Sequence, residues 1–153
     1  KDADTIKSMY PAYPMWFSTR DMARIGYLML RNGRWKDKQI TSKNWVSTIT
    51  TSFTSTKEMK MFKSPYYKDG AYMRYFGYGY LWWVWDAPEN KGAYEGAYTA
   101  QGNFGQYITV LPALDVVIAH KTKAAYDRYT SNYLTILTKL IAANNSELSA
   151  KNK

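Results

Sequence analysis

The first strong pattern along the chain is a stripe of apolar residues at helical spacing between residues 18 and 33. Ser18 and Asp21 have the spacing of a capping box, which satisfies free backbone N–H groups at the start of a helix. Asn32-Gly33 has the residue types that end helices. The pattern therefore predicts one helix from Ser18 to Asn32-Gly33, with an apolar face made of Met22, Ile25, Leu28, Met29 and Leu30.

Two further segments repeat apolar residues at helical spacing. A short helix is predicted to begin at Ser42, with a buried face made of Trp45, Val46 and Ile49. A longer amphipathic helix is predicted over residues 127–143, with a face made of Tyr133, Ile136, Leu137, Leu140 and Ile141. Residues 144–153 are polar and have no apolar face, so they are predicted to be a disordered tail.

Between these helical segments the pattern changes to short runs of β-branched and aromatic residues, which are typical of strands. The runs are residues 78–85, 94–101, 106–111 and 115–121. Because the connections between them are short, antiparallel neighbours are favoured. Residues 50–74 are polar, rich in lysine and without sustained periodicity, and are predicted to form a surface loop.

These elements predict an α/β fold of the α+β kind. An antiparallel sheet of three to four strands is packed by the C-terminal helix and preceded by a small helical portion. The length of 153 residues fits one domain, which we place at residues 1–143.

Composition and charge exclude several function classes. The net charge of +9 is consistent with an anionic partner, but lysines are spread singly over residues 36–68 without an arginine-rich helix. This distribution favours a solvated basic face over nucleic-acid binding. The chain has no cysteine for a disulfide or a thiolate metal site. No apolar run approaches the roughly 20 residues of a membrane span.

Few side chains are available for metal or acid–base chemistry. The single histidine, His120, has no imidazole partner for a metal and no Gly-x-Ser-x-Gly motif nearby, so it is interpreted as structural and no metal site is predicted. Paired carboxylates can run acid–base chemistry, as in glycosidases, and Asp86, Glu89 and Glu95 are close in sequence. We interpret them as solvated loop residues.

A cluster of tryptophans, Trp82, Trp83 and Trp85, indicates a second function class. Exposed aromatic rings stack on sugars, so a stand-alone module that binds glycan or peptidoglycan is an alternative function. Aromatics that alternate along a strand more often pack in a core, which leaves only part of this set for a ligand.

The most distinctive local feature is the pair Gly102 and Gly105 between two predicted strands. Two glycines at this spacing indicate a tight turn with exposed backbone, which a substrate can approach closely. No helix start and no Gly-Lys-Ser/Thr sequence follow, so the segment is not a phosphate loop. On spacing alone, a plain hairpin connection and a binding site are equally supported.

Four stretches, in order, resemble the serine β-lactamase-like hydrolases, which include class C β-lactamases, penicillin-binding proteins and DD-carboxypeptidases. They begin with Phe-Ser-Thr-Arg-Asp-Met-Ala-Arg-Ile-Gly-Tyr at residue 17, Ile-Thr-Ser-Lys-Asn-Trp-Val at residue 40, Gly-Tyr-Gly-Tyr-Leu-Trp-Trp at residue 77 and Gly-Asn-Phe-Gly-Gln-Tyr-Ile-Thr-Val-Leu-Pro at residue 102. The resemblance implies the C-terminal part of a fold in which the active site lies between an antiparallel sheet and a helical domain.

The chemistry that this resemblance implies is acyl transfer. A serine attacks an amide, lactam or ester carbonyl, assisted by a lysine three residues on, and water hydrolyses the acyl-enzyme. The sequence contains no Ser-x-x-Lys motif, since Thr54 and Lys57 have the spacing but begin with threonine, and it contains no Tyr-x-Asn motif. The nucleophile is therefore expected on an N-terminal part outside these residues, and this chain alone is predicted to be inactive and to hold no catalytic residue.

The resemblance assigns to this chain the family's third motif, a Lys-Thr-Gly or His-x-Gly triplet on the strand that lines the site and helps to bind the oxyanion. An amide, Gln101 or Asn103, stands where a basic residue is common, and it can donate a hydrogen bond without a full positive charge. The substrate-binding residues predicted in this way are Gln101, Gly102, Asn103, Phe104 and Gly105.

The same resemblance implies a substrate and a location. The substrate is a β-lactam, a D-alanyl peptide, an ester or an amide, without a cofactor, and the location is the periplasm, the exterior or the bacterial cell envelope. An unpaired strand edge invites association. We therefore expect the sheet to pair with the N-terminal part of the same protein or with a second copy of the chain.

Overall fold

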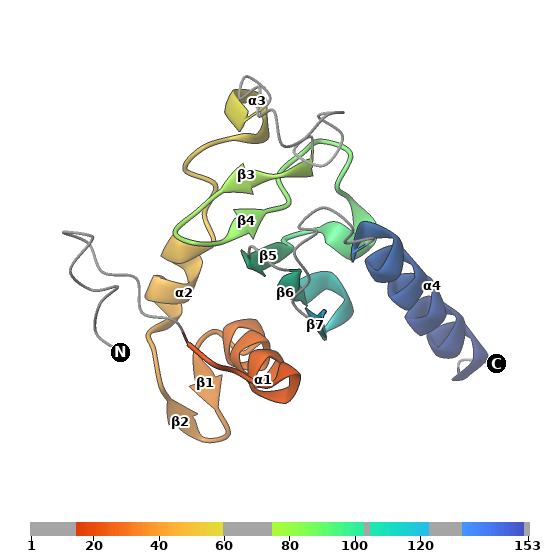
Figure 1. The fold of residues 1–153 in the computed structure, drawn as a ribbon, viewed down its shortest axis with the longest axis horizontal. Coiled ribbons are helices and arrows are strands. Elements are labelled where there is room, and N and C mark those ends of the chain that lie inside the picture. The colour runs from red at the N-terminus through yellow and green to blue at the C-terminus, as the bar shows by residue number, and fades with distance from the viewer. Residues whose placement is uncertain (1–14, 60–74, 103–104, 123–132, 152–153) are drawn as a thin grey trace.

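The computed structural model describes residues 15–59, 75–102, 105–122 and 133–151. Figure 1 shows its helices and strands: α1 (Thr19–Leu30), β1 (Arg34–Trp35), β2 (Lys38–Gln39), α2 (Lys43–Ile49), α3 (Thr56–Met59), β3 (Gly77–Tyr78), β4 (Trp83–Val84), β5 (Tyr98–Gly102), β6 (Gln106–Leu111), β7 (Val116–Lys121) and α4 (Tyr133–Lys151). Single 3-10 turns lie at Gly92–Tyr94 and Pro112–Leu114. The fold is mixed α/β with antiparallel sheets, which confirms the predicted class.

The main sheet is a five-stranded antiparallel meander in the order β3-β4-β5-β6-β7, one strand more than the largest number predicted. Its long strands are β5, β6 and β7, and the β5–β6 register runs from Tyr98 opposite Val110 to Gly102 opposite Gln106. β1 and β2 form a separate two-stranded hairpin after α1, which the sequence pattern did not indicate.

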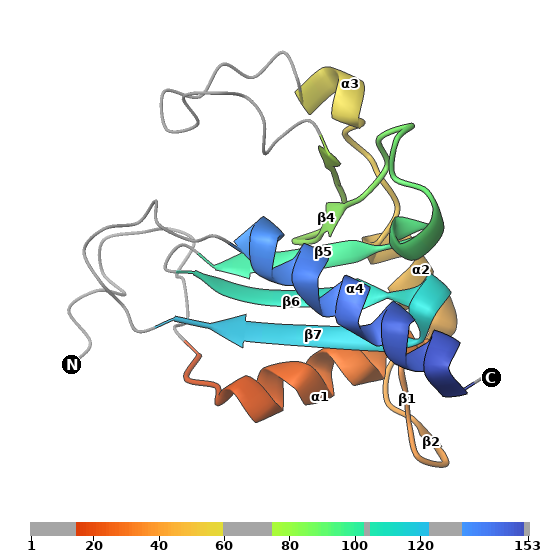
Figure 2. The same ribbon diagram turned by 90° about the vertical axis from the view of Figure 1, so that its right-hand side faces the viewer.

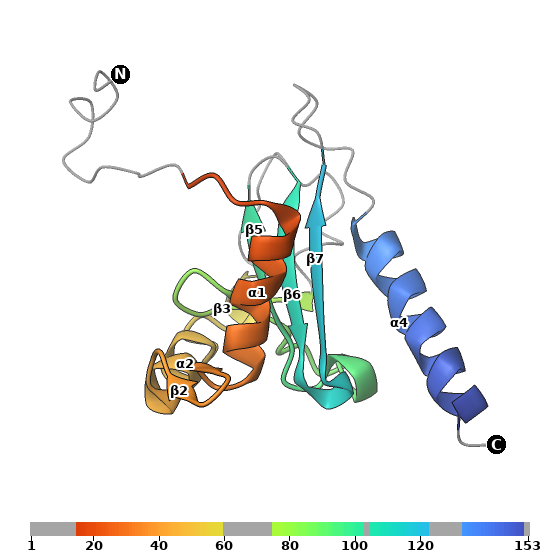
Figure 3. The ribbon, with the colours of Figure 1, turned by 90° about the horizontal axis from the view of Figure 1, so that it is seen from below.

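The sheet is covered by α1 on one face and α4 on the other, as Figures 2 and 3 show. Side chains alternate between the faces along each strand. The core between the sheet and α4 contains Phe76, Trp85, Ala97, Leu111, Ile118, Tyr133, Leu137 and Ile141. The core on the α1 side contains Met22, Met29, Val46, Trp82, Tyr98, Ile108 and Val110.

A buried chain of hydroxyl groups links α4 to the sheet. The indole N–H of Trp85 donates to Thr99 Oγ1 at 2.9 Å, and the hydroxyls of Thr99 and Thr109 bond each other at 2.9 Å. The Thr109 hydroxyl in turn bonds the hydroxyl of Tyr133. Burial raises the pKa of Tyr133, which keeps its phenol protonated and able to donate. Each of these four side chains therefore has a hydrogen-bond partner, and the first turn of α4 is fixed on β6.

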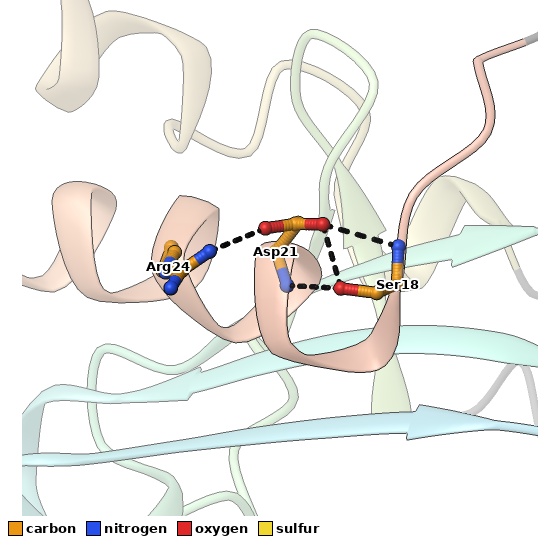
Figure 4. Close-up of polar contacts among 3 residues, drawn as sticks. All are labelled: Ser18, Asp21 and Arg24. Atoms are coloured by element: carbon orange, nitrogen blue, oxygen red, sulfur yellow. Dashed lines mark hydrogen bonds and ion pairs between the residues drawn. The ribbon is translucent and has the colours of Figure 1, made fainter.

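The start of α1 confirms the capping box (Figure 4). Ser18 Oγ accepts from the backbone N–H of Asp21 at 3.1 Å, and Asp21 Oδ2 accepts from the backbone N–H of Ser18 at 3.3 Å. Arg24 Nη1 lies 2.6 Å from Asp21 Oδ1 and forms an exposed ion pair one turn along the helix.

Removing this cap is expected to destabilise the chain in a pH-dependent way. The hydrogen bond from Ser18, and next the one from Arg24, lower the pKa of Asp21. A carboxyl with a lowered pKa contributes stability above its unfolded pKa and loses it as the pH falls through the folded value. Ser18→Ala should therefore lower the free energy of unfolding by about 1 kcal/mol at neutral pH and flatten its decline in acid.

Urea unfolding between about pH 7 and pH 2 measures both effects, since this window spans the ordinary carboxyl pKa. Ser47→Ala is the matched control, because Ser47 is an exposed serine inside α2 and caps no helix. The same acid profile for the wild type and Ser18→Ala would contradict the role of this capping box.

Residues 78–85, predicted as one strand, form two short strands and a turn. The N–H of Gly79 donates to the carbonyl of Trp82 at 2.8 Å, and Leu81 between them has a φ of +64°. Trp82 and Trp85 are buried in different cores and Trp83 is half-buried against the α4 core. The structure therefore favours the core interpretation of these tryptophans over a sugar-stacking platform.

Three further segments differ from the sequence predictions. The predicted loop contains α3 and a bridge between Thr54 and Tyr78, because ordered backbone bonds do not need an apolar period. Trp45, predicted to be buried, is 52% exposed, since α2 packs through Val46. α4 continues through Lys151 into the predicted tail, while its predicted start at residues 127–132 lies outside the described residues.

Within the described residues, no helix is long and apolar enough to cross a membrane.

Candidate functional site

The predicted site segment lies at the hairpin between β5 and β6. Gln101 and Gly102 end β5, and Gly105 immediately precedes β6. The N–H of Gly105 donates to the carbonyl of Gly102 at 3.3 Å and closes the turn. Asn103 and Phe104, the other two predicted residues, lie outside the described residues. The structure therefore brings Gln101, Gly102 and Gly105 together at one end of the sheet.

Gly105 is required by this turn, and Gly102 leaves room for the flexible side chain of Gln106. Gly105 has a φ of +80°, in the left-handed region that side chains disfavour, and a Cβ there would lie 2.5 Å from Thr122 Oγ1. A Cβ on Gly102 would collide with the side-chain oxygen of Gln106. The N–H of Thr122 donates to the carbonyl of Gly105 at 3.3 Å, so the end of β7 also holds the turn.

The edge of β5 is open at the end that carries the glycines. β4 pairs with β5 only at Tyr98 and Thr99. The N–H of Trp85 donates to the carbonyl of Ala97 at 3.0 Å, so alternation directs the backbone N–H and C=O of Gln101 toward the same side. In the described part of the chain, no strand continues β4 beside Gln101. An open edge of this kind can pair with an extended substrate or donate to a carbonyl oxygen.

The side chain of Gln101 is placed differently from its backbone. Alternation puts it on the same face as Thr99, where α4 packs, and its Nε2 is buried without a hydrogen-bond partner among the described residues. Its amide is therefore turned away from the open edge. If a side-chain amide serves the site, the sequence leaves Asn103 for that role.

His120 does not form the base of a triad in the described structure. It lies opposite Tyr107 in the β6–β7 register, and its Nδ1 is buried without a partner among the described residues. Its ring lies 5.5 Å from the ring of Tyr133, which stacks on Tyr107 at 3.9 Å. This packing agrees with the structural interpretation of His120.

The remaining candidates are not brought together. Asp86 is hydrogen-bonded to the segment that leads into α3. It accepts from Ser52 Oγ at 2.5 Å and from the backbone N–H of Thr56 at 3.2 Å. Glu89 and Glu95 are exposed. Thr54 precedes α3 and so does not share a helical face with Lys57. No group of three potential metal ligands occurs among the described residues.

An exposed aromatic cluster that the sequence did not indicate lies between α2 and the β3–β4 turn. The rings of Phe53 and Tyr80 stack at 4.7 Å, and Trp45 lies 6.4 Å from Tyr80. The backbone N–H of Tyr80 donates to the carbonyl of Ile49 at 2.9 Å, which fixes the cluster on α2. The short helix α2 buries only Val46, and this leaves Trp45 exposed in the cluster.

No protein-family model and no curated protein sequence matches this chain. Among solved structures, it is similar to one described as "Putative 6-aminohexanoate-dimer hydrolase from Bacillus anthracis", at 25% sequence identity and a TM-score of 0.49. The similarity covers 81% of this chain and 29% of that one. This chain therefore spans less than a third of the length of that protein.

Proposed function

We propose that this chain forms one wall of the acyl-transfer site of a serine hydrolase that resembles the β-lactamases and penicillin-binding proteins. The observation that carries the proposal is the open edge of β5 at Gln101, next to the turn at Gly102 and Gly105. The sequence resemblance assigns the substrate-lining strand of that family to this same segment.

In this proposal the chain binds and orients the substrate and does not move protons. The nucleophilic serine and its lysine come from outside the 153 residues, which hold no Ser-x-x-Lys motif. When the serine oxygen attacks a carbonyl carbon, negative charge develops on the carbonyl oxygen. A backbone N–H at the open edge of β5 donates to that oxygen, and this stabilisation is greater in the transition state than in the bound substrate.

The substrate class follows from the chemistry of the site. An amide, lactam or ester supplies the carbonyl that the open edge can hold, and the rest of the molecule is selected by the shape of the pocket. Placement in the bacterial cell envelope belongs to the same proposal and is supported by the family resemblance alone.

The sheet has a second edge, on β7, where the other part of the protein would bind. β7 is six residues long and, in the described structure, pairs with β6 only. A long unpaired edge is a template for another strand. We assign this edge to pairing with strands of the N-terminal part of the same protein. When that part is absent, we expect the edge of β7 to pair with a second copy of the chain.

Covalent labelling tests the function. The 153-residue chain and the longer gene product that includes the upstream sequence are each treated with a fluorescent β-lactam and with a fluorophosphonate. We expect an adduct on an upstream serine of the longer product and none on the chain alone. An adduct on the chain alone would contradict the division of roles, and no adduct on a folded longer product would contradict the hydrolase function.

The exposed aromatic cluster favours a second candidate function, glycan binding. Trp45, Phe53 and Tyr80 present half-exposed rings on a rigid backbone, as a platform for a sugar ring requires. Binding of N-acetylglucosamine oligomers to the chain, lost in Trp45→Ala and kept in Trp16→Ala, would establish this function. Trp16 is the matched control because it is exposed and is not part of the cluster.

A further inference from the structure

The outward face of α1 carries arginines. The helix buries Met22, Gly26 and Met29 against the sheet. The positions on the opposite side follow the spacing i, i+4, i+7 and i+11, and they are occupied by Arg20, Arg24, Tyr27 and Arg31. In the sequence these arginines look scattered, but the helix aligns them in one row.

The row ends at a surface hollow between α1 and the β1–β2 hairpin, lined by Tyr27, Arg31, Arg34 and Lys36. Arg31 is held rigidly there, because its guanidinium contacts Asp115 at 2.7 and 2.8 Å and lies over the ring of Tyr27 at 5.0 Å. Tyr27 in turn meets Trp35 edge to face at 5.8 Å. The wall of the hollow is therefore preorganised.

The other two cations of the hollow are uncompensated. Arg34 and Lys36 are exposed, and neither has an ion-pair partner within the described ranges. Lys36 has a φ of +52° at the first central position of the two-residue hairpin turn, where glycine is favoured. A lysine at this position costs backbone strain and brings its charge to the hollow.

The hairpin that carries these cations is fixed to the end of α1. The side-chain amide of Gln39 donates to the carbonyl of Asn32 at 2.7 Å and to that of Thr41 at 2.5 Å. The acidic groups nearby are Asp115, which is bound to Arg31, and the exposed Asp37 in the turn itself. One carboxylate in the turn therefore opposes two uncompensated cations.

We propose that this hollow binds a phosphate group, carried either by a soluble phosphate ester or by the head group of an anionic phospholipid. Two uncompensated cations, Arg34 and Lys36, line this hollow beside the guanidinium of Arg31. A tetrahedral anion offers more acceptor oxygens than a carboxylate and suits both the forked guanidinium and the ammonium group. The net charge of +9 increases the rate of encounter with such ligands. The site is distinct from the open edge of β5 and does not depend on the hydrolase proposal.

The test compares two double variants with the same loss of charge. Arg34→Gln/Lys36→Gln removes the free cations of the hollow. Lys57→Gln/Lys91→Gln removes two exposed lysines elsewhere, one of them on α3, at the opposite end of the fold from β2 in Figure 1. Calorimetry with inorganic phosphate at constant ionic strength covers the soluble source. Sedimentation with phosphatidylcholine vesicles, with and without phosphatidylglycerol, covers the lipid source.

We expect a loss of about fivefold in affinity for each cation removed from the hollow, hence roughly twenty-fivefold in the first variant, and less than about twofold in the second. Asp37→Asn should strengthen binding. Binding of phosphate alone assigns a soluble ester, and selective binding to phosphatidylglycerol vesicles assigns the head group. Equal losses in both double variants, no loss in the first, or no binding by the wild type would overturn the proposal; circular dichroism verifies that each variant is folded.

Discussion

Replacing Leu137 by alanine is expected to lower the free energy of unfolding by about 3 kcal/mol. Leu137 is 0% exposed and belongs to the core that α4 forms with Phe76, Trp85 and Leu111. The substitution removes buried apolar surface and leaves a cavity that the surrounding sheet cannot fill, since its side chains are anchored on strands.

The matched control is Leu140→Ala on the same helix. Leu140 is 46% exposed, so its truncation should cost less than about 1 kcal/mol. Urea unfolding followed by tryptophan fluorescence and by circular dichroism measures both variants. Equal costs for the two leucines would show that α4 does not dock through the face described here.

The second large effect is expected for Gly105→Ala. Alanine at a φ of +80° costs about 1–2 kcal/mol, and its Cβ would also displace Thr122. In the longer serine hydrolase that we propose, the displaced turn should slow acylation by about a hundredfold, because small misplacements of groups around a reacting carbonyl have effects of this size.

Gly92→Ala separates backbone strain from damage to the site. Gly92 has a φ of +63°, but no atom lies within 4 Å of the position of its Cβ. The Gly92→Ala variant should lose about as much stability as Gly105→Ala and should keep the acylation rate of the unsubstituted protein. Unchanged acylation in Gly105→Ala, measured under conditions where the protein is folded, would refute the role of the β5–β6 hairpin.

Elements fixed by local side-chain patterns were predictable from the sequence. The capping box of Ser18 and Asp21 located the start of α1, and the Gln106–Leu111 run coincides with β6. In both, the signal lies within a few residues of the structure it specifies. The β7 prediction differed by one residue, because Asp115 adopts a φ of +54° in the turn before the strand.

Elements fixed by distant contacts were not predictable. The run from Tyr78 to Trp85 has no period, so nothing local indicates a left-handed φ at Leu81. The turn is set by the end of α2, since a Cβ on Gly79 would overlap the carbonyl oxygen of Ile49, which also accepts from the N–H of Tyr80 at 2.9 Å. A contact between segments so far apart in sequence appears only in the folded chain.

The candidate site was predictable in composition and not in geometry. The glycines at 102 and 105 indicated a turn with exposed backbone. That the edge beside Gln101 is open depends on where β4 ends, and the pattern predicted β4 only as part of one longer strand over residues 78–85. The basic hollow likewise required the exact rotation of α1, which places Tyr27 and Arg31 beside the hairpin.

The close seating of α1 on the sheet makes Gly26 and Val117 a single steric unit. A Cβ on Gly26 would lie 2.8 Å from Ile108 Cγ2 and would also overlap a methyl group of Val117. A side chain at residue 26 is therefore compatible with this fold only where residue 117 becomes smaller and the side chain of Ile108 shifts. The two positions should vary together in related sequences, and substitutions at both should be strongly non-additive in stability.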